Sequence, residues 1–377
     1  DGLHEDLSPG DVIFADDGSL RFTVTAVTGR DISCSAETTG TLRSRKGINV
    51  PNVHLRGNLV TDRDREIIAF ARDHDIDFVG ISFVESGDHI DEIRGISSTS
   101  WPRIVAKIET QRAMENLVDI IGCADVIMID RGDLAVETNV ESTALQQKQV
   151  LKVAKQLGKP VIVATEMLHS MIQNPVPTKA EVSDITNAVL DGCAATMLSG
   201  ETAIGQFPVE AVSVMRKICD AAMPFVGQLS DRTVEYRETH SIPQAMESAI
   251  ATLCEQLPVT KIVAITVSGF AARVLASRLW HQPILAVSND VRAARSFNLL
   301  PGTQGVHVDL PFERTSTDHI AACLKDLWRR GKLDATDLVL VTAVGYPKSG
   351  NRMNLIQTHY VADLVSALGW RRSPGTM

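Results

Sequence analysis

A lysine, two carboxylates and a threonine stand near the ends of three successive strand-like segments in the first half of the chain. Lys107 and Glu109 close the first segment, and Asp133 and Thr165 stand at the ends of the other two. In a parallel β/α fold, the chemistry lies where the strands meet the following helices. These side-chain types at that edge predict a cation-assisted site for a phosphorylated acid.

Five strand-like runs, each followed by a helical pattern, must position these side chains. The runs are Phe78–Val84, Ile104–Glu109, Asp125–Asp130, Pro160–Met167 and Ala194–Gly200. Short loops separate the strands from the helices, as is typical of successive β/α units. The sequence therefore predicts five consecutive parallel strands with their functional ends on one side.

The spacing of the charged residues favours a bound cation. Lys107 and Glu109 are two residues apart on a strand, so their side chains point to the same face, where a buried lysine needs a polar partner. Glu109 and Asp133 would repel each other unless a cation lay between them, and oxygen ligands favour Mg²⁺ or Mn²⁺. The alternatives are a purely structural Lys–Glu ion pair and, for Thr165, a hydroxyl that bonds to its own backbone.

Composition limits the class of protein. The 377 residues, with 44% hydrophobic and 22% charged, predict two or three globular domains. The net charge of −9 argues against a nucleic-acid partner. Apolar runs are shorter than the roughly 20 residues that a membrane span needs, so no membrane partner is expected. Six scattered cysteines without a CxxC motif predict reduced thiols and a cytoplasmic location.

The chain divides into three predicted parts. Residues 1–56 contain short strand runs separated by Gly, Asp and Asn turn signals, which indicates a small β module. In residues 57–226 the alternation of strands and helices dominates. Residues 227–377 begin with a polar connection, after which the alternation resumes, and this predicts a separate open α/β domain.

Several longer motifs resemble those of pyruvate kinases and occur in the same order. They are Ile104–Glu109, Ile127–Leu134, Lys159–Leu168, Pro177–Glu181, Asn187–Gly192 and Met197–Ala203. The resemblance implies an α/β protein with a (β/α)8 TIM barrel, a β lid inserted after the third strand, and a C-terminal regulatory and oligomerisation domain. A closed barrel needs eight strands, and five are counted here. We therefore expect strands 4–8 only, a lid remnant in residues 1–56, and an N-terminally incomplete or short-form chain that is inactive alone.

The resemblance also implies a reaction, namely phosphoryl transfer from phosphoenolpyruvate to ADP to give pyruvate and ATP. Lys107 would neutralise the phosphoryl group, Glu109 and Asp133 would bind Mg²⁺ or Mn²⁺, and Thr165 would lie over the enolate. Gly132 and Asp133 would contact the substrate, because glycine allows close backbone approach and helix-start amides bind carboxylates. A K⁺ ion would use residues absent from this chain. A homotetramer with a sugar-phosphate effector is the expected assembly.

Two further sites follow from the resemblance. Lys46, at the end of the β module, matches a lysine that approaches the nucleotide phosphates, although a solvated lysine is an equal alternative. Thr266 and Ser268 lie where a strand meets a helix and match part of an effector phosphate loop. A capped helix start without a ligand is the alternative for this pair.

Two positions depart from the family pattern, which usually carries Ala where Asp130 stands and Gly where Ala135 stands. These departures and the missing strands leave a second hypothesis open, a catalytically impaired or regulatory pseudoenzyme. A third hypothesis is a metal-dependent aldolase or decarboxylase of pyruvate-type acids. The lid remnant and the C-terminal domain disfavour it, because a simple lyase lacks both.

Overall fold

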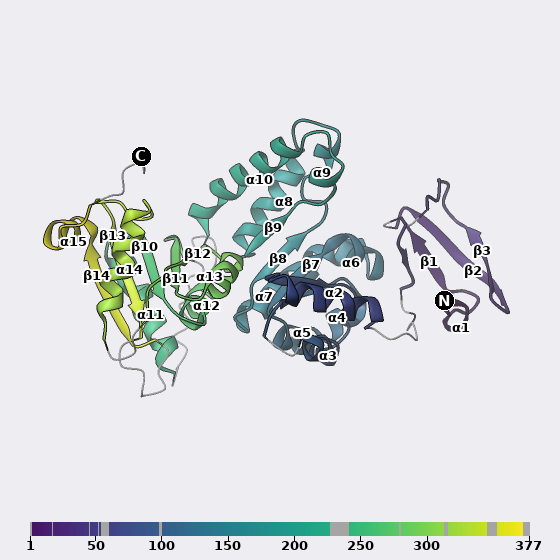
Figure 1. Ribbon diagram of the computed structural model, residues 1–377. Helices are drawn as coiled ribbons and strands as arrows, with labels where there is room; N and C mark the ends of the chain where they lie inside the picture. Colours follow the sequence, from purple (N-terminus) through teal and green to yellow (C-terminus); the bar gives the residue numbers. More distant parts are fainter. Residues whose placement is uncertain are drawn as a thin grey trace. The chain divides into compact units, whose positions relative to one another are not determined.

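A computed structural model describes residues 2–16, 18–44, 46–51, 53, 60–97, 100–226, 241–278, 280–312, 316–344 and 353–371. The chain divides into two units, Asp1–Cys219 and Asp220–Met377 (Figure 1). The first unit contains a four-stranded antiparallel sheet and a five-stranded parallel sheet, and the second unit contains a five-stranded mixed sheet.

The antiparallel sheet of the first unit has the strand order β3-β2-β1-β4. Its strands are β1 (Val12–Ala15), β2 (Leu20–Thr28), β3 (Asp31–Ala36) and β4 (Ile48–Asn49), and a short helix α1 (Leu3–Asp6) precedes them. The turn between β1 and β2 contains Gly18 at a φ of 81°, a left-handed conformation that glycine adopts without steric cost. Leu7, Ile13, Val24 and Val50 form its small core.

The parallel sheet has the sequential order β5-β6-β7-β8-β9. Its strands are β5 (Phe78–Ile81), β6 (Arg103–Ile108), β7 (Val126–Asp130), β8 (Val161–Ala164) and β9 (Ala195–Met197). The expectation of five consecutive parallel strands is therefore confirmed. Strands β5, β7, β8 and β9 are shorter than the predicted runs, whose outer residues belong to the connections, and β6 has the predicted length but begins one residue earlier.

Helices follow or separate these strands. They are α2 (Asp62–Asp73), α3 (Gly87–Ser97), α4 (Gln111–Glu115), α5 (Leu117–Cys123), α6 (Arg131–Glu137), α7 (Thr143–Gln156), α8 (Lys179–Leu190), α9 (Gly200–Ala203) and α10 (Pro208–Ala222), with single 3₁₀ turns η1 (Val140–Ser142), η2 (His169–Ile172) and η3 (Met223–Phe225). A capping box of Thr178 and Glu181 begins α8. The sequence pattern over residues 111–121 predicts one helix, but the structure has two, α4 and α5, that meet at Asn116. Asn116 ends α4, and its side-chain amide donates a hydrogen bond to the carbonyl of Glu85 at 2.8 Å.

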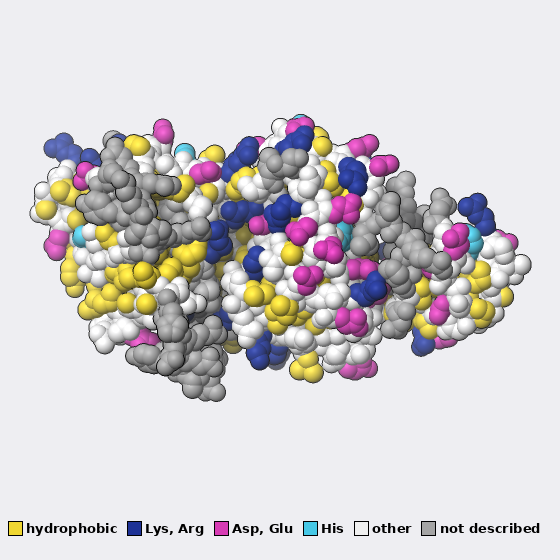
Figure 2. All heavy atoms as spheres, turned by 90° about the horizontal axis from the view of Figure 1, so that it is seen from below, with side chains coloured by type: hydrophobic (Ala, Val, Ile, Leu, Met, Phe, Trp, Pro, Cys, Tyr) yellow, Lys and Arg dark blue, Asp and Glu magenta, His cyan; other side chains and the backbone are white. Residues whose placement is uncertain are grey.

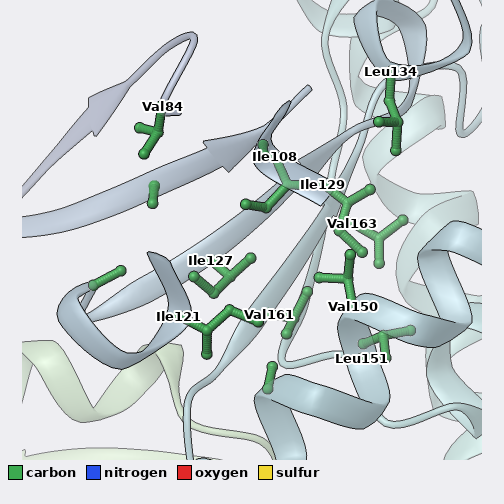
Figure 3. Packing of buried hydrophobic residues seen from close by; sticks show 14 of the residues in the cluster. Val84, Ile108, Ile121, Ile127, Ile129, Leu134, Val150, Leu151, Val161 and Val163 are labelled. Atoms are coloured by element: carbon green, nitrogen blue, oxygen red, sulfur yellow. The ribbon is translucent and has the colours of Figure 1, made fainter. Parts of the chain in front are cut away.

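Side-chain alternation gives the parallel sheet one apolar face and one face that carries the charged groups. Ile108, Ile127, Ile129, Val161 and Val163 belong to one core cluster, which packs against the helices (Figure 3). The intervening positions on the strands, and the residues that follow them, point to the opposite face. Lys107, Glu109 and Asp130 occupy such positions, so burial of the isoleucine and valine side chains fixes where these charges lie.

The second unit is an open sheet of order β12-β11-β10-β13-β14. Its elements are α11 (Ile242–Gln256), β10 (Lys261–Ile265), α12 (Phe270–Ala276), β11 (Ile284–Ser288), α13 (Val291–Ser296), η4 (Phe297–Leu299), β12 (Thr303–His307), α14 (Asp318–Arg329), β13 (Leu338–Ala343), β14 (Leu355–Tyr360) and α15 (Val361–Leu368). Strands β10 to β13 pair in parallel, as the predicted alternation requires. The antiparallel strand β14 and helix α15 were not predicted. The half-exposed residues of β14, which include Gln357, Thr358 and His359, lack the apolar run of a buried strand.

A buried aspartate of the second unit should make its stability depend on pH. Asp337 accepts hydrogen bonds from Lys261 Nζ at 2.6 Å, Thr260 Oγ1 at 2.8 Å and the Asp334 amide at 2.7 Å. Burial by itself raises the pKa of Asp337, but these donors outweigh it and hold the pKa below its ordinary value. The stabilisation is complete above the unfolded pKa of about 3.9 and is lost as the pH falls through the lower folded pKa.

We therefore expect Asp337→Asn to lower the free energy of unfolding of the second unit by about 1–3 kcal/mol at pH 7. The difference between the variant and the wild type should shrink below pH 4, because the wild-type carboxylate then takes up its proton. Denaturant unfolding at several pH values, monitored by circular dichroism, measures this difference in the free energy of unfolding. A difference that is equal at pH 7 and pH 3 would contradict this account.

Among the described residues, no helix combines the length and the apolar character that crossing a bilayer requires. On the face visible in Figure 2, the side chains of Asp and Glu lie among those of Lys and Arg.

Candidate active site

The charged cluster lies at the carboxyl ends of β6 and β7. Lys107 on β6 is the register partner of Met128 on β7, so Glu109 and Asp130, two residues further along, stand level on the same face. Helix α6 begins at once after Asp130 and adds Asp133 from its first turn. Oxygen atoms of Glu109, Asp130 and Asp133 lie within 4.8 Å of one another. The structure thus brings three of the predicted residues, Lys107, Glu109 and Asp133, together with Asp130.

The ammonium group of Lys107 is surrounded by oxygen atoms. Its Nζ lies 2.8 Å from Glu109 Oε2 and 2.9 Å from Asp130 Oδ2, and it donates a hydrogen bond to Ser82 Oγ at 3.2 Å. Burial lowers the pKa of Lys107, but the two facing carboxylates outweigh this effect and hold the pKa above its ordinary value. Lys107 is therefore a fixed positive charge whose side chain is 20% exposed.

Glu109 is fully buried at the centre of the cluster. Its Oε1 accepts a hydrogen bond from the Phe83 amide at 2.7 Å, which fixes the carboxylate plane. Its Oε2 forms the ion pair with Lys107 but receives no hydrogen bond of regular geometry from the described residues. Burial raises the pKa of Glu109, and the ion pair with Lys107 opposes this shift.

The donor set of the cluster fits a hard divalent cation. Three carboxylates against one ammonium leave two negative charges, and oxygen atoms are the ligands that Mg²⁺ and Mn²⁺ prefer. The buried Glu109 Oε2, without a regular hydrogen bond, has a lone pair that can bind such an ion. Glu109, through this Oε2, and Asp133 would hold the ion, as the sequence predicts, and Asp130 is the third carboxylate of the same cluster.

Thr165 and Gly132 meet beside this cluster. Thr165 Oγ1 donates to the Ala164 carbonyl at 2.6 Å and accepts from the Gly132 amide at 2.9 Å. The backbone of Thr165 has a φ of 68°, a strained conformation for a β-branched residue. Arg131 stabilises it, because Nη2 donates to the Thr165 carbonyl at 2.7 Å while Nη1 pairs with Asp184 at 2.6 Å. The Thr165 hydroxyl therefore bonds to the adjacent backbone, as expected for a purely structural threonine, and it also accepts a hydrogen bond from Gly132.

Gly132 borders a small open space. A methyl group on its Cα would lie 3.7 Å from Thr165 Oγ1 and 3.8 Å from Asp130 Oδ1, which are ordinary contact distances. The space between the hydroxyl of Thr165 and the carboxylate of Asp130 therefore has room for an atom. The Gly132 amide itself donates to Thr165 Oγ1 in this arrangement.

Asn49 is a residue of the site that sequence reasoning missed. It lies on β4, is 5% exposed, and donates hydrogen bonds to Glu137 Oε1 at 3.1 Å and Asp133 Oδ1 at 3.4 Å. Burial raises the pKa of Glu137, and the Asn49 hydrogen bond opposes this shift. Asn49 thus links the antiparallel sheet to helix α6. Its position three residues after Lys46 was the signal available in the sequence.

The other predicted residues lie outside the cluster. Lys46 is exposed and pairs with Asp16 at 2.5 Å, while its neighbour Arg45 lies outside the described residues. Thr266 and Ser268 belong to the second unit. Thr266 Oγ1 accepts a hydrogen bond from the Gly269 amide at 3.2 Å, ahead of helix α12, whose N-cap Gly269 has no side-chain cap, and Ser268 is exposed.

Known proteins with similar sequences agree on one family. Residues 1–212 match the family model described as pyruvate kinase, barrel domain, and residues 244–359 match the one described as pyruvate kinase, alpha/beta domain. The chain is 38% identical over 346 residues to pyruvate kinase 2 of Synechocystis sp., an overlap of 90% of this chain and 58% of that protein. It is 35% identical over 361 residues to a pyruvate kinase of Clostridium perfringens, covering 92% of this chain and 74% of the relative.

A pyruvate kinase of Geobacillus stearothermophilus is 37% identical over 374 residues, which cover 97% of this chain and 63% of the relative. The chain therefore spans 58% to 74% of the length of these three curated relatives.

Proposed function

Because this chain belongs to the pyruvate kinase family, we propose that the protein transfers the phosphoryl group of phosphoenolpyruvate to ADP, giving pyruvate and ATP. The arrangement of Lys107 between buried carboxylates, at the strand ends beside Thr165, carries this proposal. Phosphoryl transfer needs little covalent chemistry from the protein, and it depends on positioning and on charge stabilisation. A fixed ammonium beside a carboxylate cluster supplies both.

Each residue of the cluster has a proposed role. Glu109 and Asp133 hold the divalent cation, which supplies positive charge to the oxygens of the bound substrate. Lys107 faces the phosphoryl group and stabilises the charge on its oxygens during transfer. An oxygen of the ADP β-phosphate attacks phosphorus, the bond from phosphorus to the enol oxygen breaks, and the resulting enolate takes a proton at carbon. Thr165 lies over the enolate and positions that protonation.

Gly132 and Asp133 are proposed to line the substrate pocket. We expect Gly132→Ala to raise the KM for phosphoenolpyruvate about tenfold or more, because its methyl group would occupy the space between Thr165 and Asp130. Stability should not fall, since the methyl makes ordinary contacts and alanine is favoured over glycine within a helix. Steady-state kinetics and thermal unfolding of the variant measure the two effects. An unchanged KM would remove Gly132 from the pocket.

The domain assignment is part of the proposal. Residues 1–56 form the lid module, residues 57–226 the catalytic part, and residues 227–377 the regulatory and oligomerisation domain. The parallel sheet β5 to β9 represents strands 4–8 of an eight-stranded barrel. The match to the barrel-domain model and the sequential strand order support this assignment.

Further partners follow from the same family. Lys46 is proposed to approach the nucleotide phosphates, and Thr266 with Ser268 to contact a sugar-phosphate effector. A homotetramer and a K⁺ requirement are proposed by family membership alone. The six cysteines are free thiols, which supports a cytoplasmic location.

A coupled assay tests the proposed reaction. The protein that carries this chain, at its full natural length, is incubated with phosphoenolpyruvate, ADP and Mg²⁺, and lactate dehydrogenase with NADH reports pyruvate. We expect NADH oxidation that requires both ADP and the divalent cation. The matched control omits ADP, because an aldolase or decarboxylase would not need it.

A regulatory pseudoenzyme is the second candidate. The ion pair between Asp130 and Lys107 favours it, since the family pattern usually has no acidic side chain at that position. Such a protein would bind Mn²⁺ in a titration but would form no pyruvate in the coupled assay. Pyruvate formation at an ordinary kinase rate would exclude this candidate.

A further inference from the structure

Lys107 has two carboxylate partners, and only one of them has a role in the proposed function. Glu109 and Asp130 approach its Nζ from different strands at 2.8 and 2.9 Å. We propose that Asp130 is a positioning residue that holds the Lys107 ammonium in place while Glu109 binds the divalent cation. This inference rests on the proposed function and deepens it.

Glu109 cannot serve the lysine and the cation equally. Its Oε1 is committed to the Phe83 amide, so Oε2 faces Lys107 and is also the atom left for a metal ion. A divalent ion bound to this oxygen would repel the nearby ammonium, because both are positive. With Glu109 as its only acidic partner, Lys107 would lose much of the attraction that holds its ammonium when the ion enters.

Asp130 resolves this competition by its place in the sheet. It stands on β7 level with Glu109 on β6, so its short side chain reaches the same ammonium from the neighbouring strand. Its Oδ1 is directed to the space beside Gly132, and its Oδ2 is directed to Lys107. The carboxylate of Asp130 therefore stays with the lysine when Glu109 turns to the ion.

Burial makes this contact durable. The side chain of Asp130 is 10% exposed and that of Lys107 is 20% exposed, so separating the two would leave two poorly solvated charges. Ser82 Oγ, at 3.2 Å from Nζ, gives the ammonium a third oxygen and completes its set of three acceptors. The lysine is thus held from β6, β7 and the end of β5.

The test uses Asp130→Asn, which keeps the shape and removes the charge, and Asp130→Glu, which keeps the charge, in the full-length protein. With Asn, kcat at saturating Mn²⁺ should fall about tenfold or more, whereas an electron paramagnetic resonance titration with Mn²⁺ alone should still detect the bound ion. Asp133→Ala is the matched variant in which Mn²⁺ binding should weaken. Asp130→Glu should recover part of kcat.

A second measurement does not depend on activity. The rate at which an N-hydroxysuccinimide ester acylates Lys107, followed by peptide mass spectrometry, should rise several-fold in Asp130→Asn, because the amine loses an anchor. Lys148 is the internal reference, because its Nζ pairs with Asp191 Oδ2 at 2.6 Å and not with a carboxylate of this cluster.

Three outcomes would overturn the role of Asp130. They are loss of Mn²⁺ binding in Asp130→Asn to the extent seen for Asp133→Ala, recovery of wild-type kcat at saturating Mn²⁺, or an unchanged rate of Lys107 acylation. The first two would make Asp130 a ligand of the ion. A wild-type protein that forms no pyruvate would refute the proposed function, and the acylation and Mn²⁺ experiments would still decide the role of Asp130.

Discussion

Lys107→Met should lower kcat for pyruvate formation about 1,000-fold or more in the full-length protein, while the fold is retained. The ammonium is the one positive charge fixed among the cluster carboxylates of the described residues, and removal of a group that stabilises transition-state charge has effects of this size. Methionine keeps most of the packing of the lysine stem. The loss should therefore appear in kcat and not in the yield of folded protein.

The control for this variant is Lys148→Met. Lys148 also forms an ion pair, with Asp191, but its side chain is 54% exposed and the pair joins α7 to the end of α8. Stopped assays over long incubation times measure the residual rate, and circular dichroism checks the fold of both variants. Pyruvate formation by Lys107→Met within tenfold of the wild-type rate would remove the lysine from the transition state.

Glu109→Gln combined with Asp133→Ala should weaken Mn²⁺ binding about 100-fold or more. A hard cation loses two of its charged ligands, and the site changes from two negative charges to neutral. Glutamine keeps an oxygen for the hydrogen bond from the Phe83 amide, so the peptide after β5 should keep its position. Isothermal titration calorimetry with Mn²⁺ measures the affinity.

Each single variant should show an intermediate loss, because the two carboxylates act on one ion. Asp191→Asn, which removes a partly buried carboxylate paired with Lys148 in the same unit, should leave the Mn²⁺ affinity within about twofold of the wild type. Unchanged affinity in the double variant would place the ion elsewhere.

The positions of the strands could be predicted from the sequence because buried strands appear in it as short runs of apolar residues. Runs such as residues 126–130 are apolar on the face that packs against the helices, and the polar residues begin where that packing ends. The convergence of Lys107 and Glu109 follows from their spacing of two. The division of residues 111–121 into two helices at Asn116 could not be predicted in this way. The side chain of Asn116 bonds to the carbonyl of Glu85, which is 31 residues away in the sequence.

The part of the site that escaped prediction depends on distances between elements. Asp130 attracted notice only as a departure from a family pattern, and its pairing with Lys107 required the register between β6 and β7. Asn49 reaches Asp133 across 84 residues of sequence. No local pattern carries information about such contacts, because tertiary packing decides them. Strand β14 was missed for a related reason, as its partner β13 determines its pairing and its own residues are half exposed.

The strained backbone of Thr165 has a consequence for the order of folding. A threonine at a φ of 68° is unfavourable by itself, and the groups that stabilise it, the side chain of Arg131 and the amide of Gly132, come from 34 and 33 residues earlier in the chain. The loop after β8 therefore cannot reach its final conformation before β7 and β8 have paired. The hydroxyl of Thr165 becomes correctly oriented only after two consecutive β/α units have docked, so a partly folded chain holds no half-formed version of this part of the site.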